Sequence, residues 1–197
     1  MLATIFSLAL TFFLVANPIG NSPTILSLVK NFDFEKQKII VFREAMISLI
    51  IALFFLFFGE VFLDMLKIDN YALKLTGGVV LFLVALQMIF HKPESSQDEE
   101  HKNEPFIVPI ATPLISGPGL MTMIMVSSGD NPMLVVFFGI LIAWIGVTAI
   151  LVSSPYIQKI VGKRGMAAME QVMGMILGLI SMQMIVHGAE DFVKTLQ

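Results

Sequence analysis

The most constraining feature of the sequence is a series of apolar stretches, each long enough to cross a lipid bilayer. Met133 to Ile157, for example, contains no charged residue, and a membrane-spanning helix needs about 20 mostly apolar residues. The chain of 197 residues is 56% hydrophobic and only 14% charged, whereas soluble domains carry roughly 25% charged residues. These values predict an integral membrane protein with the lipid bilayer as its surroundings.

Six such stretches predict an all-α fold of six transmembrane helices, with no room for a soluble domain. A polar segment separates the third stretch from the fourth and has the composition of a solvated linker. We therefore expect a first three-helix repeat over residues 1–90, a cytoplasmic linker over 91–105 and a second three-helix repeat over 106–197. The predicted spans are Leu2–Val29, Ile39–Leu63, Tyr71–Phe90, Phe106–Ser128, Met133–Ile157 and Gln171–Val186.

The first and fourth predicted spans are interrupted by similar motifs. Ala16–Pro23 and Ala111–Pro118 both read Ala-x-Pro-x-x-x-x-Pro and lie 95 positions apart. Since proline removes a backbone donor and clashes with the preceding turn, we expect Asn17–Ser22 and Thr112–Gly117 to be non-helical and to face each other. In lipid, such breaks are tolerated only where protein buries them or they line a polar cavity. Matching broken helices indicate a transporter site; the alternative is that the prolines only kink the helices for packing.

A second similarity between the halves involves the third and sixth spans. Gly78 and the Gln-Met-Ile triplet that begins at Gln87 match Gly174 and the triplet that begins at Gln183, at an offset of 96. Because each half then has an odd number of spans, the two repeats must be inverted relative to each other. The sequence therefore predicts two inverted repeats whose first helices are broken.

The breaks supply uncharged groups that suit a small zwitterion. Ser22-Pro23 and Gly117-Pro118 each look like the start of a half-helix, whose free N–H groups attract a carboxylate. The carbonyl groups of the preceding half-helices could accept hydrogen bonds from an ammonium group. Gln87 and Gln183 could line the pathway, although hydrogen bonding between helices is the plainer interpretation. The candidate substrate-binding residues are Asn17, Pro18, Gly20, Asn21, Ser22, Pro23, Thr112, Pro113, Ser116, Gly117 and Pro118.

The distribution of charge limits the function. Neither break contains a charged residue, which favours a neutral amino acid such as glycine or alanine as substrate. Arg43 and Glu44 lie one turn inside the second span and are expected to form an interfacial ion pair, with a proton relay as the alternative. The sequence predicts no catalytic residue, metal or cofactor, and the net charge of −3 gives no reason to expect nucleic acid. A membrane scaffold, an intramembrane enzyme and a passive channel are the competing functions.

Basic residues predict the orientation in the membrane, because cytoplasmic loops are enriched in Lys and Arg. Nine of them lie on the side of the linker and only three on the other, which places both termini outside the cytoplasm. Leu2 to Ala16 spans roughly 21 Å at about 1.5 Å per residue, so the breaks are expected in the cytoplasmic half of a core about 30 Å thick. The nine residues are Lys30, Lys36, Lys38, Arg43, Lys92, Lys102, Lys159, Lys163 and Arg164; the three are Lys67, Lys74 and Lys194.

The motifs Ala16-Asn-Pro-Ile-Gly-Asn-Ser-Pro23 and Pro113-Leu-Ile-Ser-Gly-Pro-Gly119 resemble those of the MarC family of bacterial inner-membrane proteins. The resemblance covers essentially the whole chain and includes Leu75-Thr-Gly-Gly-Val-Val-Leu-Phe-Leu-Val-Ala-Leu86. It implies six spans and a place in a group of neutral amino acid transporters that is distantly similar to LysE-type exporters. A coupling proton or sodium ion and assembly into a homo-oligomer are further partners that the sequence allows.

Overall fold

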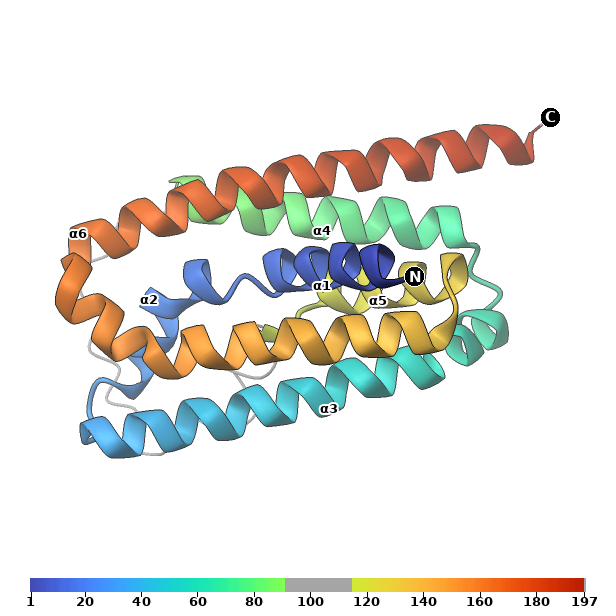
Figure 1. Cartoon of the computed structure of the whole chain (residues 1–197). Coiled ribbons are helices and arrows are strands. Elements are labelled where there is room, and N and C mark those ends of the chain that lie inside the picture. The colour runs from blue at the N-terminus through green and yellow to red at the C-terminus, as the bar shows by residue number, and fades with distance from the viewer. Residues whose placement is uncertain (91–114, 197) are drawn as a thin grey trace.

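The computed structural model describes residues 1–90 and 115–196 as a bundle of long helices lying side by side (Figure 1). Both termini lie at one end of this bundle, and the chain reverses within the longest helix at the opposite end. The helices are α1 (Leu2–Ala16), α2 (Pro18–Val29), α3 (Phe34–Leu66), α4 (Asn70–Phe90), α5 (Pro118–Asp130) and α6 (Met133–Thr195). The all-helical fold expected from the sequence is thus confirmed for these residues.

Five segments of the described chain are long and apolar enough to cross a membrane. They correspond to the first, second, third, fifth and sixth predicted spans: Leu2–Val29, Phe34–Leu66, Asn70–Phe90, Met133–Gly162 and Arg164–Thr195. The fourth predicted span, Phe106–Ser128, begins outside the described residues. Its described part is α5, which has 13 residues and would extend only about 20 Å.

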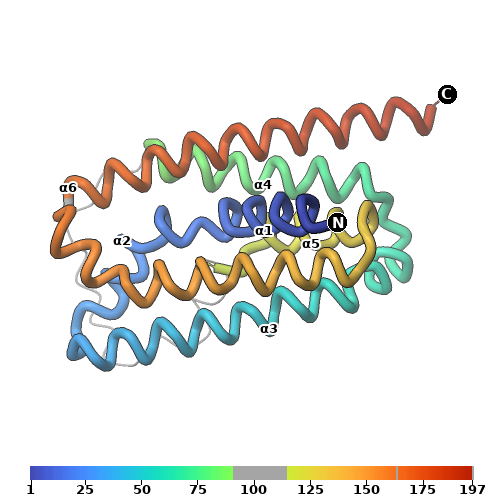
Figure 2. The backbone as a smooth tube through the Cα atoms, viewed as in Figure 1, coloured from blue at the N-terminus to red at the C-terminus, as the bar shows by residue number. Residues whose placement is uncertain are grey.

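The fifth and sixth spans are joined at Gly162 (Figure 2). This glycine has φ 74° and ψ 171°, a combination that is essentially restricted to glycine. The residues on both sides of it are helical, so no loop separates the predicted spans that ended at Ile157 and began at Gln171. A single residue reverses the chain without a loop, because its backbone has a conformation that only glycine readily adopts.

The outer surface of the bundle is apolar along the whole length of its long helices. Exposed aromatic and aliphatic side chains on each of these helices form this surface, as expected where lipid tails replace water. Examples are Phe6, Leu10, Ile50, Phe58, Leu83, Phe138, Ile145 and Leu179. The buried residues include polar side chains such as Asn17, Glu44 and Ser116.

The third and sixth spans pack through reciprocal contacts of their glycines. A Cβ atom added at Gly78 would lie 3.0 Å from the carbonyl oxygen of Ser181, and one at Gly174 would lie 3.1 Å from that of Ala85. An offset of 96 relates Gly78 to Gly174 and also Ala85 to Ser181. The two helices run in opposite directions (Figure 1), so the same local contact is made twice with the roles of the helices exchanged.

We expect Gly78→Ala and Gly174→Ala to destabilise the protein by similar amounts, about 1–3 kcal/mol each. Each new methyl group would press on the backbone of the opposite helix, which cannot move like a flexible side chain. The midpoint of thermal unfolding in detergent measures the effect. Gly178→Ala is the control, since its Cβ would meet only the Cβ of Ala85 at 3.7 Å. Unchanged stability in both test variants would contradict close packing at these glycines.

Candidate functional site

The helical path of the first span is interrupted at a single residue, Asn17. Its backbone adopts the left-handed conformation with φ 49° and ψ 53°, which asparagine tolerates better than most residues. The side-chain oxygen accepts a hydrogen bond from the Gly20 N–H at 3.1 Å, and the side-chain amide donates to Met88 Sδ at 3.0 Å. With 2% of its surface exposed, Asn17 both caps α2 and attaches it to α4.

The residues that follow Asn17 are helical, so the expected unwinding of Asn17–Ser22 is wrong beyond its first residue. Pro18 occupies the first position of α2, where the missing N–H removes no helical hydrogen bond. Helix α2 therefore begins at Pro18, and the predicted start at Ser22-Pro23 is also wrong. Pro23 lies inside the helix.

Two side chains of α2 bind carbonyl oxygens around this junction. Asn21 Nδ2 donates to the Ala16 carbonyl at 3.1 Å, which is near the end of α1, where carbonyl groups have no helical donor. Ser22 Oγ donates to the Pro18 carbonyl at 2.6 Å. The polar side chains predicted for the site thus surround the junction.

The second junction is described from Ile115 onward; Thr112 and Pro113 lie outside the described residues. Ser116 is fully buried, and its hydroxyl donates to the Ser48 carbonyl of α3 at 2.8 Å. Gly117 is the N-cap of α5 and Pro118 is its first residue, as predicted. No side chain in the described ranges caps α5, and an uncapped helix start is the kind of site that attracts an anion.

The two junctions are attached to different helices. Asn17 contacts Met88, which lies about 27 Å along α4 from its first residue at about 1.5 Å per residue. Ser116 contacts Ser48, in the middle part of α3. The first junction is therefore nearer to the end of the bundle opposite the termini.

A cavity of about 270 Å³ lies toward the end that holds the termini. It includes Gln183 but not Gln87, whose side chain is exposed. Lys74 carries an ammonium group into the cavity, 2.8 Å from an Asp191 carboxylate oxygen and 3.8 Å from one of Asp130. The cavity is lined by Thr11, Lys74, Met123, Val126, Asp130, Ile180, Gln183, Met184 and His187.

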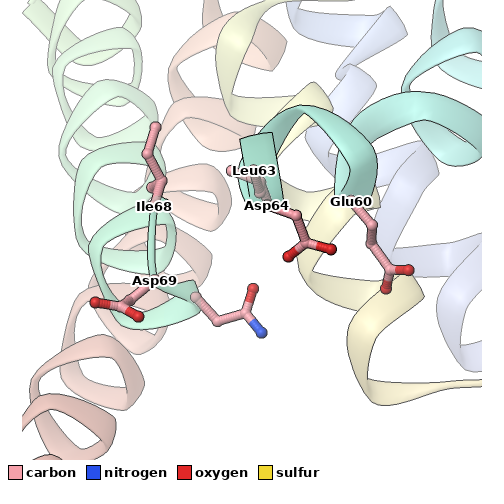
Figure 3. A pocket seen from close by; sticks show the side chains of 6 residues that line it. Glu60, Leu63, Asp64, Ile68 and Asp69 are labelled. Atoms are coloured by element: carbon pink, nitrogen blue, oxygen red, sulfur yellow. The ribbon is translucent and has the colours of Figure 1, made fainter. Parts of the chain in front are cut away.

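A second cavity, of about 240 Å³, lies where α3 passes into α4. Figure 3 shows the carboxylates of Glu60, Asp64 and Asp69 around it. It offers acids without a basic partner, so it lacks the two signs of charge that a zwitterion requires. The described residues contain no group of three or more acidic, histidine or cysteine side chains placed to hold a metal.

The sequence analysis named Glu44 but did not predict its burial. Its side chain has no exposed surface, while that of Arg43 is 34% exposed, so the expected interfacial pair is half wrong. Arg43 donates to Glu44 Oε1 through Nε at 3.0 Å, and its Nη2 atom lies 2.9 Å from the same oxygen. A helical spacing of three and four residues, which puts Glu44 on one face with Val41 and Ser48, could have indicated its burial.

Comparisons with known proteins agree along nearly the whole chain. A family model described as "MarC family integral membrane protein" matches residues 2–193. The UPF0056 membrane protein BU449 of Buchnera aphidicola is 35% identical over 96% of this chain and 98% of its own. The UPF0056 inner membrane protein YhgN of Escherichia coli K12 gives the same three values. A UPF0056 membrane protein of Chlamydia trachomatis is 33% identical over 92% of this chain and 90% of its own. No solved structure matches the chain.

Proposed function

Since the chain belongs to the MarC family of integral membrane proteins, we propose that it is a secondary transporter of small neutral amino acids. The observation that carries this proposal is the uncapped start of α5 at Gly117, inside an apolar bundle and beside buried Ser116. Free N–H groups and the helix dipole attract a carboxylate there. No charged side chain belongs to either junction, so a zwitterion fits better than a net anion or cation.

The two junctions have different roles in this proposal. At the start of α2, Asn17 already binds the Gly20 N–H, so that helix start is occupied by its own side chain. At the start of α5, the Ser116 hydroxyl donates to the Ser48 carbonyl, and no side chain of the described residues caps the helix. We therefore assign the substrate carboxylate to α5; at the end of α1 the Ala16 carbonyl already accepts from Asn21 Nδ2.

The reciprocal contacts of Gly78 and Gly174 support an inverted repeat, the architecture in which one half of a transporter rocks against the other. A movement that separates α5 from α3 would release the Ser116 hydroxyl from Ser48. The cavity with Lys74 and Asp130 offers charges of both signs at the other end of the bundle. Thr11, in its wall, is about 9 Å from Asn17 along the helix axis. The cavity is therefore suited to be the entry on that side.

We infer that the protein lies in a bacterial inner membrane with both termini outside the cytoplasm. The relative YhgN is named an inner membrane protein. The basic residues of the described chain are concentrated at the end opposite the termini (Figure 1), which supports this orientation. A reporter active only in the cytoplasm should be inactive when fused after Gln197; activity there would reverse the assignment.

Counterflow in proteoliposomes tests the proposed function. Vesicles loaded with one unlabelled neutral amino acid should accumulate the same labelled amino acid transiently and with saturation. Glycine, alanine and serine are tested beside lysine and glutamate. If no amino acid enters faster than into vesicles without protein, the proposal is wrong. Flux that rises linearly with concentration would indicate a passive channel instead.

A further inference from the structure

The buried carboxylate of Glu44 is only half paired. Its Oε1 atom accepts a hydrogen bond from Arg43 Nε and lies 2.9 Å from Arg43 Nη2, whereas Oε2 is buried without a hydrogen-bond partner among the described residues. An ionised carboxylate oxygen without a donor in an apolar interior is strongly unfavourable. The exposed neighbours Ile39 and Phe42 show that this turn of α3 already lies among lipid-facing side chains.

The donors nearest in sequence and structure do not serve Glu44. Trp144 Nε1 and Ser48 Oγ each donate to the Ala45 carbonyl at 2.8 Å. A buried hydroxyl without a partner among the described residues is Thr148 Oγ1. That atom and Glu44 Oε2 are the two buried side-chain oxygen atoms without a partner in the part of the chain that the structure describes.

Three contacts fix the register between α3 and the first half of α6. Phe34 packs on Tyr156, Ala45 accepts from Trp144, and Phe57 packs on Phe137. These segments are antiparallel, and Thr148 lies one helical turn beyond Trp144. Interpolation places Thr148 opposite the turn of α3 that contains Glu44.

We propose that Glu44 is the proton-binding residue of this protein, with Thr148 as the acceptor for the bound proton. A proton delivered by water from the end of the bundle where Arg43 is exposed forms a bond to Oε2, and the carboxylate becomes a neutral carboxylic acid. Its O–H group then donates to Thr148 Oγ1, so both unpaired atoms gain a partner. Return of the proton to water restores the carboxylate and its pairing with Arg43.

The burial of Glu44 favours a proton over a larger cation. Its side chain has no surface that a water-sized probe can touch, so neither a sodium ion nor a substrate ammonium group fits against it in this conformation. Among the described residues, Trp144 and Thr148 on α6 and Ser116 before α5 face this turn, and all three are uncharged. Helix α2 contains no titratable residue. Lys159, on α6, lies over the ring of Phe34, near the start of α3.

Coupling to transport rests on the proposed function, whereas proton binding itself does not. Ser48, one turn after Glu44, binds the hydroxyl of Ser116 beside the start of α5. Protonation changes the charge next to this contact and can thereby bias the separation of α3 from α5. An imposed proton gradient should then drive amino acid accumulation.

Infrared titration of the purified full-length protein in lipid nanodiscs tests proton binding without any substrate. We expect acidification to produce the carbonyl band of a protonated carboxyl group. This band should be lost in Glu44→Gln and retained in Glu35→Gln, which removes an exposed carboxylate from the same helix. Thr148→Val should shift the frequency of this band, because the protonated carboxyl group loses its hydrogen-bond acceptor. This variant keeps the proposal testable if Glu44→Gln does not fold.

A titration without a Glu44-dependent band, or with no shift in Thr148→Val, overturns the proposal. Transport that follows a sodium gradient and ignores a proton gradient overturns the coupling step. If the band depends on Glu44 but no amino acid is transported, the proton site stands and the proposed transport fails. Wild-type transport stimulated by a proton gradient, with Glu44→Gln exchanging substrate without that stimulation, supports both.

Discussion

Replacing Asn17 with alanine should lower the stability of the protein by about 2–4 kcal/mol and strongly reduce transport. Alanine loses the cap on the Gly20 N–H, which is worth about 1 kcal/mol, and the contact with Met88. It also has to adopt a left-handed backbone conformation, at a further cost of about 1–2 kcal/mol. Thermal unfolding and counterflow measure the two effects.

Asn17→Gly is the matched control for this prediction. Glycine also lacks the side-chain cap but adopts φ 49° without strain, so its loss of stability should be clearly smaller than that of alanine. Equal losses would show that the left-handed conformation of Asn17 contributes nothing. A stable Asn17→Ala variant would contradict the described junction between α1 and α2.

Replacing Ser116 with alanine should weaken amino acid binding tenfold to a hundredfold. The hydroxyl lies beside the free N–H groups of α5, and loss of one hydrogen bond to a charged group costs about 1.5–3 kcal/mol. Asn21→Ala, at the other junction, should have an effect of similar size. The concentration for half-maximal counterflow measures the change.

The stability of Ser116→Ala should change little, since the Ser48 carbonyl that it releases lies within the continuous helix α3. Ser181→Ala is the matched control, because that buried hydroxyl donates to Gly178 within its own helix at 2.7 Å and away from both junctions. Wild-type affinity in Ser116→Ala and Asn21→Ala together would mean that the junctions have only a structural role.

The sequence was sufficient to predict the helical class and most of the span positions. Long apolar stretches leave few alternatives in lipid, because every backbone group must find its partner inside the segment. The start of α5 at Pro118 followed from the preference for proline at the first helical position. Both predictions depend on local properties that tertiary packing does not alter.

The local geometry of the first junction could not be predicted in the same way. Two prolines in Ala16–Pro23 indicated a long unwound stretch. Instead, the left-handed Asn17 is the one non-helical residue between α1 and α2, and α2 continues through Pro23. Gly162 similarly replaces an expected loop by one unusual residue. In each case a single backbone conformation decides the outcome, and sequence patterns do not specify it.

The burial of Glu44 depends on a partner helix that is distant in sequence. An acid one turn inside a span suggests an interfacial residue that reaches water. Trp144, about a hundred residues later, packs over this turn and binds the Ala45 carbonyl. The register between α3 and α6 shows that Glu44 faces the interior.

The most direct test of the central claim is the accessibility of the second junction during transport. The chain contains no cysteine, so Ser116→Cys provides a single reactive thiol. We expect a small hydrophilic thiol reagent to modify it in proteoliposomes. Substrate at about ten times its half-saturating concentration should slow the modification roughly tenfold. Leu83→Cys, at an exposed position on the lipid-facing surface, should show no effect of substrate. A Ser116→Cys variant that transports but reacts at the same rate with and without substrate would contradict a binding site at this junction.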